Sequence, residues 1–224
     1  MLKIIEPSGR VLLDENENFG VGRPAEMKGR PEIDRVLLRG ILLDSIDAAS
    51  IQWGRKLLRV EAAADDTYDL HFADGVDTGF DLVVGADGAW SKVRQLVSET
   101  IPFYSGVTGL DVKVSDADNR NPALAKRVGG GMCLTLGENK GILAQRNGDG
   151  SIRVYAFLRV PETWSKDCDI DWTQSEPAKK ELIDGYFEDW DQGAKDLILK
   201  SDPEVIPRPM YMLPVGFKWT PRPG

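Results

Sequence analysis

The sequence predicts a mixed α/β (α+β) protein in which one helix–strand–helix region is set into a mainly antiparallel β-region. In residues 31–101, an apolar-faced helical segment precedes a continuous apolar run and a second helical segment. Residues 1–30 and 102–224 instead contain short alternating segments separated by turns rich in Gly, Asn and Asp. Elements in this order favour α+β or mixed α/β layers.

The N-terminal third begins with a predicted β-hairpin and continues into a predicted helix. "LKIIEPSGRVLLDE" predicts two strands around the turn Pro7-Ser8-Gly9, and residues 16–29 predict a polar loop. The clearest helix is "RPEIDRVLLRGILLDSI", residues 30–46, where Pro31 suits the first turn and acidic residues suit the positive end of the helix dipole. Its apolar residues at helical spacing are Ile33, Leu37, Ile41 and Leu42.

The middle of the chain predicts short strands, then a buried strand and a helix. Residues 50–75 predict short strands with turns at Asp65-Asp66 and Asp74-Gly75. The mostly apolar run "FDLVVGAD", residues 80–87, predicts a strand buried on both faces, because β-branched residues occupy both alternating positions. Residues 89–100, "AWSKVRQLVSET", continue as a predicted helix.

Beyond Pro102 the pattern changes to antiparallel strands and helices. Residues 130–160 predict three strands with turns at 138–141 and 147–150. Residues 176–200 predict two helices broken near Gly193, and "RPMYMLPVGFKW" predicts a final strand. The tryptophans share no common period, which favours core packing over a ligand platform. This applies to four of the six tryptophans, Trp164, Trp172, Trp190 and Trp219.

Composition excludes several classes of function. The net charge of −8 disfavours nucleic acid and anionic membranes as partners, and no apolar run is long enough to span a membrane. Cys133 and Cys168 lack metal-ligand spacing, a disulfide between them is unsupported, and we expect a cytoplasmic protein. Glu188, Asp189 and Asp191 predict a solvated helix end without a metal-ligand pattern.

The Asp-Gly pair in "DLVVGADGAWSKVR" is the first candidate for a binding site. Ligands of α/β sheets bind beyond the carboxyl ends of strands, where the Asp87 carboxylate would accept hydrogen bonds and Gly88 would admit a ligand closely. Lys92 and Arg94 would add positive charge near a phosphate. The alternative is that Asp87 caps the helix and Gly88 forms a turn, without any ligand.

Two further arginines form a second candidate. Arg35 and Arg39 lie four residues apart, so they share one helix face and repel each other by a few tenths of a kcal/mol. An anionic ligand such as pyrophosphate would turn that repulsion into attraction. The alternative is a solvated basic face in which Glu32 pairs with Arg35.

Together these motifs resemble the FAD-dependent aromatic hydroxylases, the para-hydroxybenzoate hydroxylase class of group A flavin monooxygenases. "DLVVGADGAWSKVR" resembles the Asp-Gly motif of the family, and "RPEIDRVLLRGILLDSI" resembles its flavin-contacting helix. A third similar region is "RVPETW…DIDW…YFEDWDQGAKDLI". Within the family the chain is most similar to the tetracycline-inactivating monooxygenases. The resemblance implies cofactor contacts by Arg35, Arg39, Asp87, Gly88 and Arg94.

The resemblance also implies a division into two domains. Residues 31–101 would be a partial, Rossmann-like FAD-binding domain, and residues 1–30 and 102–224 a discontinuous substrate-binding domain. The family's opening G-x-G-x-x-G and late Gly-Asp motifs are absent: "GVGRPA" (20–25) predicts a loop and "NGDGS" (147–151) a hairpin turn. Three explanations stay open at this point: a truncated gene model, a portion of a larger protein whose N- and C-terminal segments complete the site, or a split protein completed by another chain.

The substrate wall would be one face of the antiparallel sheet. By resemblance, the pocket-lining positions are Asp111, Met132, Leu143, Gln145, Arg153 and Tyr155. Met132 stands where the tetracycline-directed relatives carry a cationic group, so a bulky aromatic or polyketide-like molecule is the expected substrate class. Ordinary sheet packing is the alternative for all six.

The implied activity is hydroxylation by an FAD-dependent monooxygenase that uses NADPH or NADH as reductant and a flavin hydroperoxide as oxidant. The cofactor carries this chemistry, so no catalytic side chain and no metal is expected, and His71 is expected on a strand surface. Two alternatives remain: a catalytically inactive, small-molecule-binding remnant, and a flavin-dependent reductase of the same superfamily.

Overall fold

The computed structural model describes residues 1–18 and 33–221, which divide into two compact units. The larger unit comprises Met1–Arg39 and Gly106–Met210, and the smaller unit comprises Gly40–Ser105 and Tyr211–Gly224. Each unit is described by itself. The segment "GVGRPA" lies outside the described residues, as do Pro31 and Glu32.

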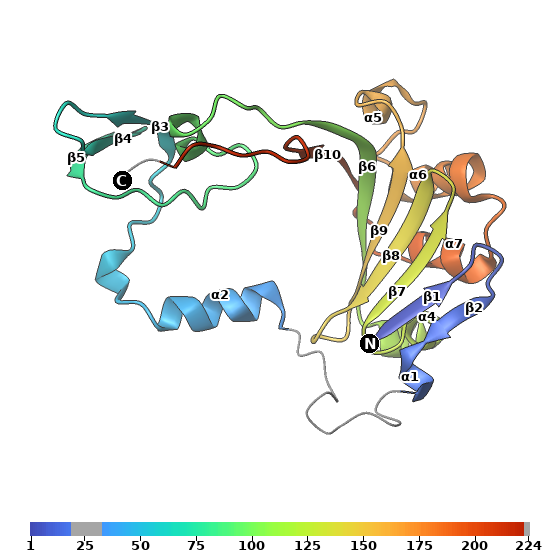
Figure 1. Cartoon of the computed structure of the whole chain (residues 1–224). Helices are drawn as coiled ribbons and strands as arrows, with labels where there is room; N and C mark the ends of the chain where they lie inside the picture. The colour runs from blue at the N-terminus through green and yellow to red at the C-terminus, as the bar shows by residue number, and fades with distance from the viewer. Residues whose placement is uncertain (19–32, 222–224) are drawn as a thin grey trace. The chain divides into compact units, whose positions relative to one another are not determined.

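A seven-stranded sheet forms the centre of the larger unit, in the order β10-β6-β9-β8-β7-β1-β2 (Figure 1). Strand β1 pairs antiparallel with β2 and parallel with β7, whereas β7 with β8, β8 with β9 and β9 with β6 pair antiparallel. Their bounds are β1 Leu2–Ile5, β2 Val11–Asp14, β6 Phe103–Val114, β7 Met132–Gly137, β8 Lys140–Arg146, β9 Ile152–Arg159 and β10 Ile206–Met212. The predicted N-terminal hairpin and the three antiparallel strands are confirmed. The final strand is confirmed as far as Met212, and residues 213–219 of its predicted range form no strand.

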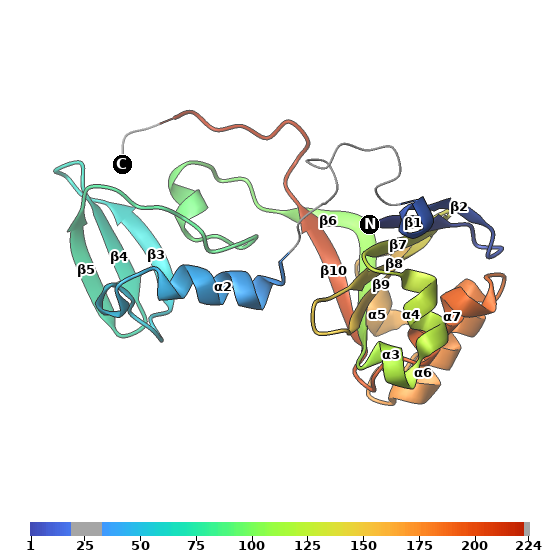
Figure 2. The same cartoon turned by 90° about the horizontal axis from the view of Figure 1, so that it is seen from below.

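Helices cover one face of this sheet, as Figure 2 shows for α3, α4, α6 and α7. Alternate residues along each strand point their side chains toward these helices, as Ile142, Val154 and Leu110 do. The helical segments are α1 Glu15–Asn18, α3 Ala117–Arg120, α4 Pro122–Val128, α5 Trp164–Asp167, α6 Ser175–Leu182, a π-turn at Ile183–Phe187, and α7 Gln192–Leu199. The helices contribute Leu124, Val128, Leu182, Phe187, Leu197 and Ile198 to the core.

The predicted pair of helices in residues 176–200 is confirmed, and its break is set by a cap. Asp191 accepts a hydrogen bond from the Gly193 backbone N–H at 2.9 Å, so α7 begins immediately after Asp191. The prediction that Asp191 is solvated is wrong, because Arg127 donates two hydrogen bonds to its carboxylate at 2.7 and 2.8 Å. Glu188 and Asp189 are exposed as expected.

Tryptophan packing is predicted correctly for the helical layer and wrongly for the C-terminal segment. Trp164 and Trp190 are buried, and Trp172 packs against the core they belong to. Trp219 is 55% exposed, although it lies 5.7 Å from the Phe217 ring, centroid to centroid. Its segment lies in the smaller unit, where Tyr68 is the one buried apolar side chain among the described residues.

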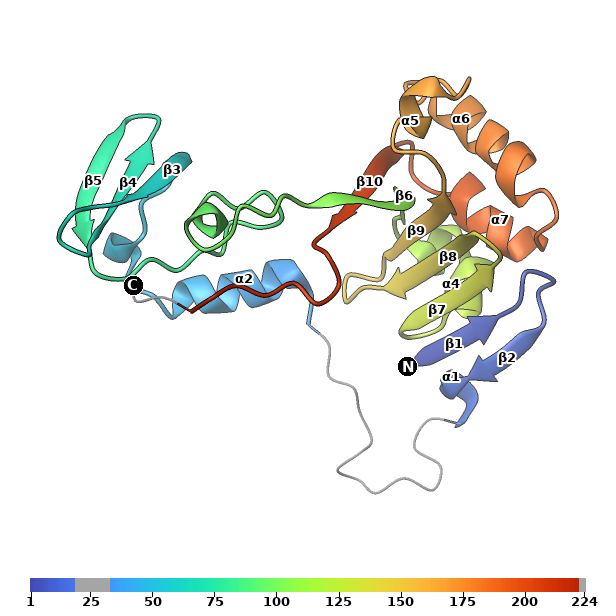
Figure 3. The same ribbon diagram turned by 45° about the horizontal axis from the view of Figure 1, so that its top comes forward.

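The smaller unit contains a three-stranded antiparallel sheet, β3-β4-β5 (Figure 3). The strands are β3 Leu57–Ala62, β4 Tyr68–Phe72 and β5 Gly75–Phe80, so the predicted turns at Asp65-Asp66 and Asp74-Gly75 are confirmed. His71 lies on β4 as expected, half-buried, with its Nε2 2.8 Å from Oε2 of Glu61. A short 3-10 helix spans Ala48–Ser50.

The predicted strand 80–87 and helix 89–100 are both wrong. Strand β5 ends at Phe80, residues 82–88 form no strand, and the helix shrinks to one 3-10 segment, Val93–Leu96. A strand buried on both faces needs hydrogen-bonded neighbours on both sides, and the described residues offer none to this run. Leu82 and Val84 are consequently 67% and 80% exposed.

Helix α2, Arg35–Asp44, confirms the predicted helix and buries none of its residues. Ile33, expected on its apolar face, precedes the helix, and the Asp34 carbonyl accepts the first backbone hydrogen bond, from Leu38 at 2.9 Å. The apolar side chains of α2 are between 41% and 81% exposed at Val36, Leu37, Leu38, Ile41 and Leu42. Among the described residues no helix is both long and apolar enough to cross a bilayer.

Candidate functional site

Asp87 caps the 3-10 segment that follows it. Its Oδ2 accepts hydrogen bonds from the backbone N–H of Lys92 at 2.6 Å and of Val93 at 3.4 Å. Partial burial opposes ionisation, but hydrogen bonds from Ser91 and these backbone groups outweigh it and hold the pKa of Asp87 below its ordinary value. The capping interpretation, kept open from the sequence, therefore describes this carboxylate.

Glycines make the turn possible and keep it open. Gly88 has φ +83°, in the left-handed region where a side chain is strained. Apart from Gly88 and its two chain neighbours, no described residue has an atom within 4 Å of the position that its Cβ would occupy. At Gly85 the constraint is space, because a Cβ there would lie 2.7 Å from Cβ of Val93. The motif thus folds back on its own 3-10 segment while leaving Gly88 accessible.

A cavity of about 410 Å³ adjoins this turn within the smaller unit. Gly85, Gly88 and Arg94 line it from the motif, so two of the predicted cofactor residues share one hollow, and Asp87 holds its wall in place. The remaining lining is mainly apolar, and its members are Tyr68, Val83, Ser91, Val93, Leu96, Val97, Leu213, Phe217 and Trp219. Lys92 lines a neighbouring hollow of about 400 Å³, together with Arg94.

Arg35 lines a different hollow, of about 620 Å³, in the larger unit. The opposite wall comes from Gly130 and from residues 145–148, so Arg35 lies at the same hollow as Gln145, a predicted substrate residue. Arg39, one turn further along α2, does not line it.

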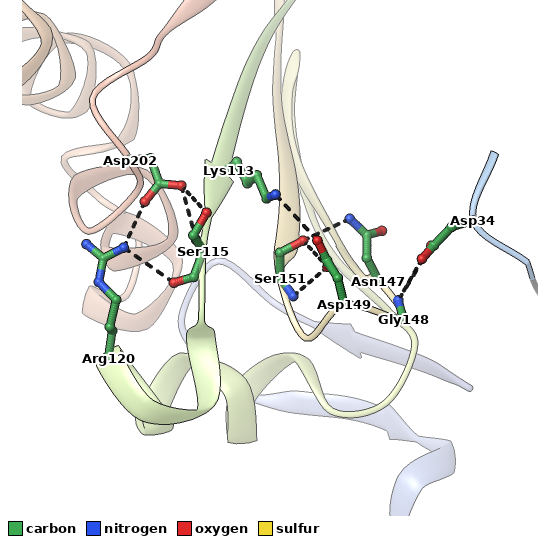
Figure 4. A network of polar contacts seen from close by, with 9 residues as sticks. All are labelled: Asp34, Lys113, Ser115, Arg120, Asn147, Gly148, Asp149, Ser151 and Asp202. Carbon is green, nitrogen blue, oxygen red and sulfur yellow. Dashed lines mark hydrogen bonds and ion pairs between the residues drawn. The ribbon is translucent and has the colours of Figure 1, made fainter. Parts of the chain in front are cut away.

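Polar contacts fix the β8–β9 hairpin beside this hollow (Figure 4). Asp149 Oδ1 accepts hydrogen bonds from the backbone N–H and the hydroxyl of Ser151, at 2.9 and 2.6 Å, which confirms "NGDGS" as a hairpin turn. Asp34 accepts a hydrogen bond from the Gly148 backbone N–H at 3.2 Å. This bond ties the residue before α2, and hence Arg35, to the hairpin.

The six predicted substrate residues lie on one face of the seven-stranded sheet, opposite the helices. Register places Asp111 beside Tyr155, Tyr155 beside Leu143, and Gln145 beside both Arg153 and Met132. Their neighbours along each strand, such as Val154 and Ala144, point into the core instead. We call the face with the six residues the open face, because the helices that form the core lie on the other side (Figure 2).

Asp111 is the electrostatic centre of the open face. Its side chain is 6% exposed, and Nη2 of Arg153 donates to its Oδ2 at 2.6 Å. Hydrogen bonding to Asp111 raises the pKa of Arg153 above its ordinary value. Arg208 on β10 also donates to Asp111 Oδ2, through Nε at 3.3 Å. The sequence analysis missed Arg208, whose only local signal is a cationic residue in a short alternating strand.

Comparisons with known proteins agree with this architecture, although no family model matches the chain. The chain is 29% identical over 253 residues to monooxygenase penA of Penicillium thymicola, covering 96% of this chain and 56% of penA. It is 30% identical over 256 residues to monooxygenase asqM of Emericella nidulans, covering 95% of this chain and 56% of asqM. The chain therefore spans about half the length of the curated relatives it matches.

Solved structures show the same fold. Klebsiella pneumoniae HpxO, crystallised with FAD and uric acid, matches with a TM-score of 0.67 and 21% identity over 94% of this chain and 51% of that one. The fold is that of FAD-binding monooxygenases, and the chain is homologous to flavin-dependent monooxygenases, so the resemblance found in the sequence is confirmed. Tetracycline destructase Tet(51) matches with a lower TM-score, 0.51, so the comparisons do not single out the tetracycline-directed branch.

Proposed function

We propose that this chain is the central portion of an FAD-dependent monooxygenase that uses NADPH or NADH and hydroxylates a bulky aromatic or polyketide-like small molecule. The observation that carries the proposal is the gathering of all six predicted substrate residues on the open face of a fold shared with FAD-complexed monooxygenases. HpxO, which shares the fold, was crystallised with uric acid, a planar heterocycle of the kind a flat sheet face can hold.

The residues beside the Asp-Gly turn fit part of a dinucleotide cofactor. Gly88 leaves open space for a close approach, and the Arg94 guanidinium at the same cavity suits a phosphate oxygen. Asp87 would position Gly88 and Arg94 through its cap. The cofactor contacts of Arg35 and Arg39 on α2 stay predictions from the family resemblance. When bound, FAD would supply the oxygen-transfer chemistry, and the open face would position the substrate and shield it from water.

Exposed apolar surface supports the proposal that further polypeptide completes the cofactor domain. Leu82 and Val84 beside the motif, and Val36, Leu37 and Ile41 on α2, are all at least half exposed. Leaving such surface in water costs about 25 cal/mol per Å². We propose that segments of a parent chain cover residues 82–88 and α2, with residues 82–85 forming a strand when a neighbour pairs with them.

The alternative is a small-molecule-binding remnant that has lost flavin. It is favoured by one observation, that the Asp-Gly run of residues 81–88 belongs to neither sheet of the described residues.

Purification of two proteins separates these possibilities: the 224-residue chain, and the same chain extended at both ends by the flanking open reading frame. Under the proposal the extended protein is yellow, retains FAD and consumes oxygen when NADPH or NADH is added with an aromatic substrate. An extended protein that is colourless after reconstitution with FAD contradicts the monooxygenase and supports the remnant. Retained flavin without substrate-dependent oxygen consumption supports a reductase instead.

A variant tests whether the Asp-Gly cavity takes part. Arg94→Gln removes the guanidinium that lines the cavity, and we expect about a tenfold weaker affinity for FAD in the extended protein, because a charge-assisted contact contributes about 1.5–3 kcal/mol. Arg59→Gln is the matched control, since Arg59 lies on β3 of the same unit and pairs with Glu61 at 2.8 Å. Equal FAD affinities of the two variants would remove this cavity from the proposal.

A further inference from the structure

Two arginines share one carboxylate on the open face. We call Asp111, Arg153 and Arg208 the Asp111 cluster. Arg153 approaches with Nη2 2.6 Å from Oδ2 and Nε 2.5 Å from Oδ1, and the second approach is a charge contact that is not aligned as a hydrogen bond. Arg208 approaches Oδ2 with Nε at 3.3 Å. Since the carboxylate carries one negative charge and the two guanidiniums one positive charge each, the cluster has a net charge of +1.

The exposure of the three side chains shows which groups remain for a ligand. Asp111 is 6% exposed, so it is held beneath its partners, whereas Arg153 and Arg208 are 37% and 55% exposed. Arg208 contacts Asp111 through Nε, and neither of its Nη groups forms a hydrogen bond or ion pair with a described residue. A guanidinium oriented by a buried carboxylate, with its outer donors open, is prepared to bind an oxyanion in a fork.

Other charges on this face do not cancel the cluster. Lys113 lies opposite Arg153 on the neighbouring strand β6, and its Nζ is 3.5 Å from Oδ2 of Asp149. The Lys113–Asp149 pair therefore carries no net charge. Gln145, on the other side of Arg153, carries no charge. The positive cluster therefore stands out in a chain whose net charge is −8.

An aromatic surface adjoins the cluster. The rings of Tyr155 and Phe157, alternate residues of β9, stack with centroids 6.0 Å apart and an interplanar angle of 21°. Tyr155 lies beside Asp111 and Phe157 beside Gly109 in the register. A Cβ on Gly109 would lie 3.1 Å from the Phe157 ring, so the glycine lets this ring lie across β6, close to the backbone of Arg208.

We propose that the Asp111 cluster is an anion subsite of the open face, which selects planar aromatic substrates bearing an ionised oxygen group, such as a carboxylate, phenolate or enolate. Arg208 is the specificity-determining residue, Arg153 supports it, and Asp111 positions both guanidiniums. The ring of the substrate lies against Tyr155 and Phe157 while its anionic group accepts hydrogen bonds from Arg208. This inference rests on the proposed function in taking the open face as the substrate wall.

The test uses two probes that differ in charge only at one substituent, 2-naphthoate and 2-naphthylmethanol. Titration calorimetry with the 224-residue chain gives both affinities, and amide NMR shifts in β6, β9 and β10 give the location. We expect naphthoate to bind at least about tenfold more tightly than the alcohol, with an affinity that falls as ionic strength rises. Arg208→Gln should weaken naphthoate binding about tenfold and change the affinity for the alcohol less than about twofold.

Two further variants sharpen the test. Arg10→Gln is the matched control: it removes one cationic side chain from the β1–β2 turn, where Arg10 pairs with Glu6 at 2.6 Å, and it should leave both affinities unchanged. Arg208→Lys keeps the charge but loses the fork, so its naphthoate affinity should fall between those of the native chain and Arg208→Gln. Arg208 is more than half exposed, so circular dichroism should show all three variants folded.

The proposal is overturned by equal affinities for the two probes, by unchanged naphthoate binding in Arg208→Gln, or by an absence of naphthoate binding at millimolar concentration. These results are independent of flavin retention by the extended protein. Flavin-dependent oxygen consumption without charge selectivity would refute the anion subsite alone. Charge-selective binding in a protein that never retains flavin would refute the monooxygenase and leave a binding module with this subsite.

Discussion

Replacement of Asp87 by alanine should loosen the turn that forms one wall of the smaller unit's cavity. The carboxylate accepts backbone hydrogen bonds from Lys92 at 2.6 Å and Val93 at 3.4 Å, and alanine can accept neither. Loss of a capping side chain of this kind costs about 0.5–2 kcal/mol. Since about 1.36 kcal/mol corresponds to a factor of ten, the Lys92 amide should lose protection from hydrogen exchange by about two- to thirtyfold.

Amide hydrogen exchange followed by NMR measures this change residue by residue. Asp81→Ala is the matched control, because it removes the same charge from the same segment at a residue whose side chain forms no hydrogen bond or ion pair with residues 1–18 or 33–221. Asp87→Asn should behave nearly as the native chain does, since an amide oxygen also caps well. Unchanged exchange of Lys92 in Asp87→Ala would refute the capping argument, and so would an equal loss in Asp81→Ala.

Three other experiments, two on variants and one on the native chain, have outcomes that the structure specifies. Gly88→Ala meets no steric clash but must hold φ near +83°, so it should cost about 1–2 kcal/mol of local stability. Gly54→Ala, at φ +76° in the same unit, is the control and should lower the free energy of unfolding by a similar amount in a denaturant titration. Only Gly88→Ala should weaken FAD binding by the extended protein. Asp202 accepts hydrogen bonds from the Ser115 hydroxyl at 2.6 Å and from Nη1 of Arg120 at 3.0 Å (Figure 4). Partial burial raises the pKa of Asp202, but these hydrogen bonds outweigh burial and lower it, so the stabilisation is complete above the unfolded pKa and is lost as pH falls through the folded pKa. Asp202→Asn should therefore flatten acid unfolding curves in that range, and identical curves would contradict this. Burial raises the pKa of the Cys133 thiol to about 11, so this thiol should react slowly with an alkylating reagent at pH 8. Mass spectrometry should therefore detect alkylation of the half-buried Cys168 first. Preferential alkylation of Cys133 would contradict this prediction.

Local patterns predicted those parts of the fold that depend on local interactions. Strands β7, β8 and β9 have clear alternation and turns of two to five residues, so their pairing and the face of each side chain followed from the sequence. The period of two places Leu143 and Gln145 on one side of their strand, and Arg153 and Tyr155 on one side of theirs. That these residues share one face of the sheet was expected from the family resemblance. Asp111 was identified by family resemblance, and its buried position between two arginines required the structure.

Long-range pairing was beyond the reach of these patterns. The parallel contact of β1 with β7 joins residues separated by about 130 positions, and β10 reaches β6 from about 100 positions away. Arg208 acquires its role only through that second contact. The strand predicted at 80–87 failed for the converse reason: its composition suits a buried strand, but the described residues provide no partner for its backbone.

The distribution of buried side chains links the cap of Asp87 to cofactor binding. Among the described residues, every fully buried apolar side chain except Tyr68 belongs to the larger unit. The smaller unit therefore depends on backbone hydrogen bonds, caps and ion pairs such as Arg55 with Asp77 at 3.2 Å, and its local stability is low. Under the proposed function, a cofactor that binds the ordered turn stabilises it by about 2.7 kcal/mol at a concentration one hundred times its Kd. This gain exceeds the cost of about 1 kcal/mol of losing the cap, so saturating FAD should restore the protection of Lys92 in an Asp87→Ala form of the extended protein. A cofactor that failed to restore it would have to bind elsewhere than at this turn.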